Sequence, residues 1–148
     1  MIDISCECAD LPERLFEPGE VILKEGGETG FLYFLKEGKV EIQRSGEKIA
    51  ESDEPGAIFG EISILLGRPH MADVIALEKC TFHVAEDAES YLREHPEVNI
   101  CISRDLAKKV DQLSCYLVDL KQQFSDETNH LGMVHEVLDT LMQLPSGR

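Results

Sequence analysis

The sequence lacks the features of a membrane or exported protein. Its apolar runs are short and interrupted by charged residues, and the N-terminal stretch MIDISCECAD has no basic region followed by an apolar one. It contains no lipidation motif either. We therefore expect a soluble, cytoplasmic protein that makes no contact with a membrane.

A cysteine framework is also missing, because the five cysteines are an odd number at irregular spacing. Scattered cysteines of this kind are typical of reduced thiols in a cytoplasm. Cys6 and Cys8 form the one close pair, and a metal or iron-sulfur site would need two further soft ligands at defined spacing. We expect no metal site. A haem or metal group held through His70 or His83 is the alternative left open.

Basic residues are scarce, since 14 Lys and Arg stand against 29 Asp and Glu and the net charge is −15. Such a chain repels nucleic acid, so no nucleic-acid partner is expected. An anion-binding site here must be local and well formed. Nucleophile elbows, Walker loops and His-Glu-x-x-His motifs are absent as well, and the five histidines are scattered. We therefore expect no catalytic residues and no enzyme activity.

Short β-forming runs and turn residues alternate from Glu13 to Val84. The runs are EVILK, FLYFLK, KVEIQR, EKIAES, ADVIAL and CTFHVA, and the turns contain Pro18-Gly19, Gly26-Gly27, Gly38, Ser45-Gly46, Pro55-Gly56, Gly60, Gly67 and Pro69. This alternation is typical of an antiparallel β-sandwich or small barrel. A length of 148 residues with 43% hydrophobic content is enough for one domain with a core.

Three segments have helical character instead. EISILL is read as a helical turn, because Glu61 and Ser63 can serve its first turn before Gly67 ends it. EDAESYLREHP begins with an acidic first turn and stops near His95-Pro96. A heptad stripe then follows, formed by Leu106, Val110, Leu113, Leu117, Leu120 and Phe124.

The heptad stripe predicts a homodimer interface. A stripe this narrow suits a partner helix, parallel or antiparallel. The alternative is packing on the chain's own β-domain, for which Ile102, Ala107 and Tyr116 are also available. The register resumes at Leu131, Val134, Leu138 and Leu141 with Glu127 between, and Ser125 can start a new helix. We therefore expect a break near 125–129.

The combined pattern resembles a known family. The runs FEPGEVILKEGGETGFLYFLKEGKVEI and GEISILLGRPHMADVIAL, followed by a helix and a leucine-striped helix, are similar to the cyclic nucleotide-binding domain of the catabolite activator, protein kinase regulatory subunit and cyclic-nucleotide-gated channel superfamily. The resemblance covers about residues 13–124. It implies a mainly β fold, with an antiparallel jelly-roll β-barrel in residues 1–95 and a long dimerising α-helix in a C-terminal helical segment, 96–148.

The resemblance also implies a phosphate-binding cassette at residues 59–72. In this family a Gly-Glu pair begins a short helix whose amides hold the cyclic phosphate, while the glutamate accepts from the ribose 2′-hydroxyl. Gly60 and Glu61 match, although Glu61 can equally be a first-turn carboxylate of its own helix. Leu113 and Ser114 are nearest to the family's base-capping position. The predicted ligand residues are Phe59, Gly60, Glu61, Ile62, Ser63, Arg68, His70, Met71, Ala72 and Ser114.

The cassette departs from the family at its second half. Where relatives have Pro, Arg, Ser or Thr, then Ala, this chain has Pro69, His70, Met71 and Ala72. A hydrogen bond to a charged group contributes about 1.5 to 3 kcal/mol. Its loss weakens binding about tenfold to over a hundredfold. Arg68 or a protonated His70 are the available substitutes.

Two functions follow from these observations. The first is a stand-alone regulatory sensor that binds a cyclic nucleotide weakly, cyclic AMP in preference to cyclic GMP, and signals through its C-terminal helix to an unidentified protein partner. The second is a ligand-independent dimeric interaction scaffold. Neither needs a cofactor. The chain ends at Arg148 without a helix-turn-helix segment, and a fragment of a longer protein is the alternative to a stand-alone one.

Overall fold

A computed structural model describes residues 9–123, 136–137 and 140–141. The contacts between residues divide the chain into two units, Met1–Ile102 and Ser103–Arg148, and each is treated by itself. The elements are β1 (Glu13–Phe16), β2 (Val21–Leu23), β3 (Leu32–Glu37), β4 (Val40–Arg44), β5 (Glu47–Ser52), β6 (Ile58–Phe59), α2 (Glu61–Leu66), β7 (Asp73–Ala76), β8 (Cys80–Ala85), α3 (Ala88–Glu94) and α4 (Pro96–Gln123).

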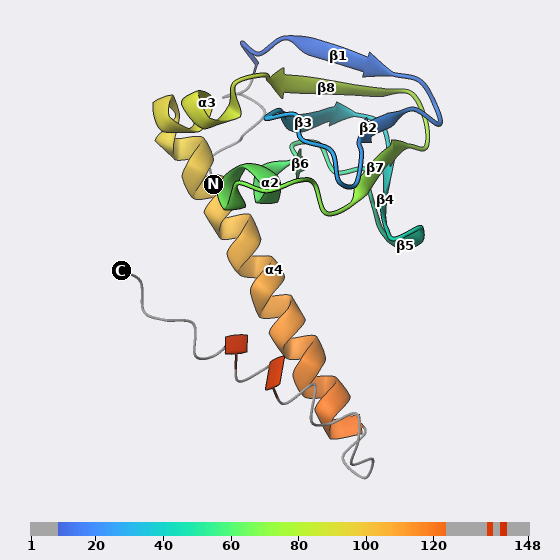
Figure 1. Ribbon diagram of the computed structural model, residues 1–148, viewed down its shortest axis with the longest axis vertical. Coiled ribbons are helices and arrows are strands. Elements are labelled where there is room, and N and C mark those ends of the chain that lie inside the picture. The colour runs from blue at the N-terminus through green and yellow to red at the C-terminus, as the bar shows by residue number, and fades with distance from the viewer. Residues whose placement is uncertain (1–8, 124–135, 138–139, 142–148) are drawn as a thin grey trace. The chain divides into compact units, whose positions relative to one another are not determined.

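The first unit contains two antiparallel sheets of four strands each (Figure 1). Sheet 1 has the order β1-β8-β3-β6 and sheet 2 the order β2-β7-β4-β5. The predicted jelly-roll fold is confirmed as this pair of sheets. All six quoted runs contain a strand, whereas β1 and β6 were not among the runs. The β1 segment ERLF has no alternation of polar and apolar residues in its sequence, and β6 has only 2 residues, so neither stands out as a strand.

The main core lies between the two sheets. Strands β3 and β8 alternate their side chains, so that Tyr33, Phe82 and Val84 point into it. The ring of Phe82 meets the rings of Phe16, Tyr33 and Phe59 edge to face, with centroids 5.6, 5.7 and 6.1 Å apart. Each such buried aromatic or aliphatic side chain stabilises the fold by about 1.5 to 3 kcal/mol. Burial also raises the pKa of the Tyr33 hydroxyl.

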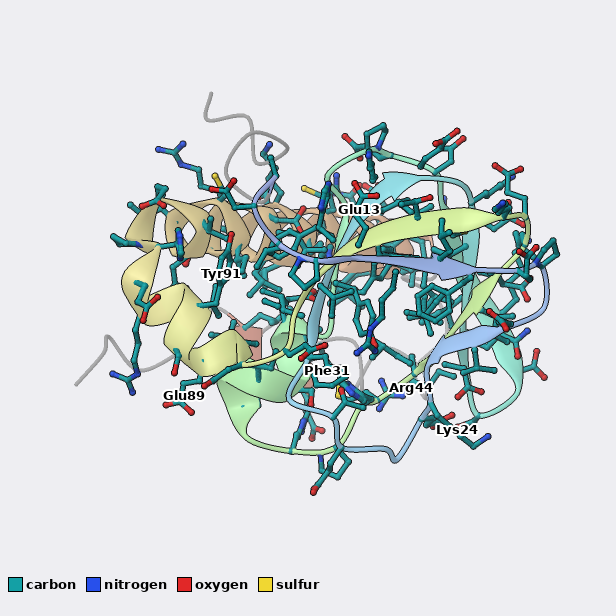
Figure 2. The ribbon with its side chains drawn as sticks, turned by 90° about the horizontal axis from the view of Figure 1, so that it is seen from above. Glu13, Lys24, Phe31, Arg44, Glu89 and Tyr91 are labelled. Carbon is teal, nitrogen blue, oxygen red and sulfur yellow. The ribbon has the colours of Figure 1, made fainter. Side chains whose placement is uncertain are left out.

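The opposite face of sheet 1 is covered by α3. Phe34 is fully buried, and its ring centroid lies 6.0 Å from that of Tyr91, which projects from α3 towards the sheet (Figure 2). The helix starts as the sequence predicts, because the Asp87 carboxylate accepts from the Ser90 amide at 3.3 Å. The expected helices at 61–66 and before Pro96 are both confirmed, as α2 and α3.

Helix α4 begins at Pro96, ten residues before the first leucine of the stripe. Proline suits the first turn of a helix because it has no amide hydrogen to leave unpaired. In the second unit, the side chains of Val110 and Leu113 are 42% and 48% exposed. Phe124, the expected break at 125–129, and the stripe positions 131, 134 and 138 lie outside the described residues. In the part of the chain that is described, no helix combines the length and the hydropathy required to cross a membrane.

Candidate functional site

The candidate site begins where β6 passes into α2. Phe59 pairs with Tyr33 in sheet 1, which brings the next residue, Gly60, against the Phe31 carbonyl oxygen. A Cβ atom on Gly60 would lie 2.7 Å from that oxygen, and the φ angle of Gly60 is +94°. Both facts require glycine at this position. The sheet therefore fixes the start of the cassette.

Helix α2 has six residues and is flanked by Gly60 and Gly67. Its residue Glu61 is 5% exposed and therefore buried, while Ile62 and Ser63 are half-buried. The Ser63 hydroxyl donates to the Arg68 carbonyl at 2.6 Å, and the Arg68 amide donates to the Ser63 carbonyl at 3.1 Å. The Ser63 side chain therefore closes the C-terminal end of the helix. The backbone amides of Ile62 and Ser63 belong to the first turn, as the cassette prediction requires.

His70 is buried and held by the β2–β3 loop. Its side chain is 5% exposed, and its Nε2 lies 3.0 Å from the Thr29 hydroxyl. Burial lowers the pKa of the imidazole below its ordinary value of 6.5. The ring is therefore neutral near pH 7. Of the two available substitutes for the arginine, a protonated His70 is therefore disfavoured.

Arg68 lies in the segment between α2 and β7. It is exposed, and its guanidinium contacts the sulfur of Met71. Met71 and Ala72 are half-buried ahead of β7, where Asp73 accepts from the Glu25 amide at 2.7 Å. The guanidinium of Arg68, the other candidate to replace the missing arginine, thus lies at the surface beside the Met71 thioether.

An open groove of about 400 Å³ lies next to the second half of α2. It is lined by residues 28–30 of the β2–β3 loop, by residues 86–89, and by Ser63, Ile64, Gly67 and Arg68. Gly60, Glu61 and His70 are not among its lining residues. Of the predicted ligand residues, Ser63 and Arg68 therefore face this groove. Ser114 lies on α4 in the second unit and is half-buried.

A cationic side chain that the sequence did not indicate lies at the end of sheet 1. The guanidinium of Arg14 sits 4.9 Å from the ring centre of Phe31, which Figure 2 labels, and pairs with Glu86 at 2.9 Å.

Thr29 is a second residue of the site that the sequence analysis did not single out. Its bond to His70 joins residues 41 positions apart, and no periodicity or motif reports a contact of that range.

The described residues contain no candidate metal site, and their cysteines are free thiols. No group of three or more His, Cys, Asp or Glu side chains there has a geometry that could hold a metal ion. Cys80 is buried, and its pKa is raised by that burial, while Cys101 and Cys115 are unpaired thiols. Cys6 and Cys8 lie outside the described residues.

Comparison with known proteins matches this chain to one family. A family model described as "Cyclic nucleotide-binding domain" matches residues 13–89. A cAMP-dependent protein kinase regulatory subunit of Yarrowia lipolytica is 34% identical over 47% of this chain and 18% of its own length. Potassium channel KOR1 of Oryza sativa subsp. japonica is 33% identical over 82% of this chain and 14% of its own length. The chain thus spans less than a fifth of these relatives.

A solved structure shows the same arrangement. The Catabolite Activator Protein of Thermus thermophilus is 26% identical, with a TM-score of 0.67 that covers 80% of this chain and 58% of that one.

Proposed function

We propose a function from the premise that this chain belongs to the cyclic nucleotide-binding domain family, whose model it matches over residues 13–89. Domains of this family are regulatory parts of larger systems, and the function of this chain is accordingly that of a non-enzymatic regulatory module. The observation that carries the proposal is the Gly60-Glu61 pair. It stands at the start of α2 with a glycine backbone conformation and a buried carboxylate.

The ligand we propose is a cyclic nucleotide, with cyclic AMP preferred to cyclic GMP. The Ile62 and Ser63 amides in the first turn of α2 suit its phosphate, since helix N-terminal amides have no partner within the helix. Glu61 would accept from the ribose 2′-hydroxyl. The preference for cyclic AMP is supported by the name of the Yarrowia lipolytica relative, a cAMP-dependent kinase subunit.

Binding is expected to be weak. A neutral, loop-bound His70 replaces the forked guanidinium that pairs with phosphate, and Arg68 lies at the surface. The net charge of −15 also repels an anionic ligand at long range. The missing bond accounts for about ten- to over a hundredfold in affinity.

The signal would leave through α4 in a homodimer. The stripe residues Leu106, Val110, Leu113, Leu117 and Leu120 lie on this helix at heptad spacing. Two of them, Val110 and Leu113, are 42% and 48% exposed. Exposed apolar side chains in a heptad pattern support pairing with a second copy. An unidentified protein partner would then bind the paired helices.

A ligand-independent dimeric scaffold is the second candidate function. The observation that favours it is the buried His70, which is bonded to the chain itself instead of being free to face a phosphate. Both candidates share the dimer. Ligand binding separates them.

The test measures the thermal shift and the binding heat of wild type and His70→Arg with cyclic AMP and cyclic GMP at millimolar concentration. We expect little or no stabilisation of wild type and a clear gain in His70→Arg, because arginine restores the forked pair. Glu61→Gln added to His70→Arg should remove most of that gain. Gln112→Arg, an exposed residue on α4, controls for added charge.

Each outcome has a clear meaning. A gain in His70→Arg alone supports a cassette that retains its nucleotide geometry. A strong thermal shift in wild type shows that nucleotide binding does not require an arginine at position 70. Flat results for wild type and His70→Arg with both nucleotides refute the sensor and favour the scaffold.

A further inference from the structure

The β2–β3 loop is bonded directly to the second half of the cassette. The Gly26 amide donates to the His70 carbonyl at 2.8 Å, and the His70 amide donates to the Gly27 carbonyl at 2.9 Å. The Thr29 hydroxyl lies 3.0 Å from the His70 ring. Backbone and side chain of His70 are thus both held by one loop.

The Thr29 hydroxyl can donate this bond. It accepts from the Phe31 amide at 3.3 Å, which leaves its own proton available for donation. A neutral imidazole can accept a hydrogen bond from that hydroxyl at Nε2, and burial favours the neutral form by lowering the pKa of His70. A buried polar ring costs stability unless it is bonded. The Thr29 hydroxyl removes that cost.

The loop itself is anchored at both ends. The Glu25 amide donates to the Asp73 carboxylate at 2.7 Å, and the Glu25 carboxylate accepts from the Ser45 amide at 2.9 Å. At the other end, the Gly30 carbonyl accepts from the Ala88 amide at 3.3 Å. These contacts tie the loop to the β4–β5 turn and to the start of α3. The loop is therefore a fixed support for the cassette.

We propose that Thr29 is a positioning residue that, together with the Gly26-Gly27 peptide, clamps His70 and holds the cassette in place without a ligand. This proposal rests on the proposed function in one respect, namely that residues 59–72 form the ligand site. Because the backbone at position 70 is bonded to the chain's own loop, the His70 ring is directed to Thr29. A cassette already held in this way needs little further ordering when a ligand arrives.

The test is amide hydrogen exchange in the absence of nucleotide. In wild type, the amides of Gly26 and His70 should exchange slowly, as bonded amides do. Thr29→Val, which removes the hydroxyl at nearly constant shape, should speed exchange at these amides about five- to tenfold, the factor expected for one net hydrogen bond. Thr29→Ser, which keeps the hydroxyl, should restore most of the protection.

Thr81→Val controls for the Thr-to-Val change itself, since Thr81 is a threonine on β8 in the same unit; Thr81 is half-buried, whereas Thr29 is exposed. It should leave the Gly26 and His70 amides unchanged. Equal acceleration in Thr81→Val, or no acceleration in Thr29→Val, overturns the clamp. If Thr29→Val does not fold, rapid exchange of the Gly26 and His70 amides in wild type overturns it as well. No nucleotide is present, so the result is independent of whether cyclic AMP binds.

Discussion

Two glycines flank α2, and their surroundings differ. Gly60 and Gly67 have φ angles of +94° and +61°, a region that side chains with a Cβ rarely adopt. A Cβ on Gly60 would also meet the Phe31 carbonyl at 2.7 Å, whereas a Cβ on Gly67 meets nothing within 4 Å. A residue with a Cβ would therefore be strained at both positions, but of the two only position 60 would also bring it into a clash with the Phe31 carbonyl.

Gly60→Ala should therefore destabilise the protein more than Gly67→Ala. Backbone strain costs about 1 to 3 kcal/mol at either site, and Gly60→Ala must in addition displace the Phe31 carbonyl. Urea unfolding followed by circular dichroism measures both free energies of unfolding. Equal losses for the two variants would contradict the close approach of β6 and the Phe31 carbonyl.

Strands β4 and β5 of sheet 2 share a network of charged side chains. The Glu51 carboxylate lies 2.8 Å from the Lys39 ammonium and also contacts that of Lys48. Lys48 lies 3.8 Å from Glu41. Hydrogen bonds from Lys39 and then Lys48 lower the pKa of Glu51 to about 2 from its ordinary value of 4.5. The folded protein therefore favours the charged form of Glu51.

This lowered pKa predicts the direction of an acid effect. The ion pairs of Glu51 stabilise the fold above about pH 4.5, and that contribution is lost as the pH falls towards 2. Glu51→Gln should lower the melting temperature slightly at pH 7, with the difference from wild type shrinking below about pH 4.5. The effect is small because the pairs are exposed. Scanning calorimetry across this pH range measures it.

Glu47→Gln is the matched control on the same strand, because Glu47 forms no ion pair among the described residues. Its melting temperature should follow wild type at every pH. A difference between wild type and Glu51→Gln that stays constant from pH 7 to pH 3 would refute the network's electrostatic origin. Added salt should reduce the difference at pH 7.

At the scale of the whole molecule, the proposed dimer brings together two strongly acidic copies. Each carries a net charge of −15, so electrostatic repulsion opposes pairing while the apolar stripe on α4 favours it. Salt screens the repulsion and strengthens apolar association. The balance between the two terms should therefore depend on ionic strength.

Sedimentation equilibrium should show a dimer whose fraction rises with protein concentration and with salt. Leu113→Asp places a charge in the stripe and should shift the protein to monomer. Gln112→Asp adds the same charge one residue away from the stripe and should not. A wild-type monomer at high concentration and high salt, or equal behaviour of the two variants, would refute pairing through α4.

Local sequence determined most of the elements of this protein. Turn glycines and short β-forming runs are enough to predict the strands from β2 to β5, β7 and β8, and an acidic first turn with a stop near Pro96 is enough to predict α3, because these signals act within a few residues. The Gly60-Glu61 pair also led to the prediction of the cassette, through the resemblance to a family. Such features follow from backbone preference and short-range hydrogen bonding.

Tertiary structure decided how the cassette is held. The pairing of β1 with β8, the burial of Glu61 and the bond between Thr29 and His70 all join residues far apart in the chain or depend on what covers them. Their energies arise only when distant segments meet and exclude water. The sequence could therefore show that His70 stands where relatives have an arginine, but only the fold showed that its ring is buried and bonded to its own loop.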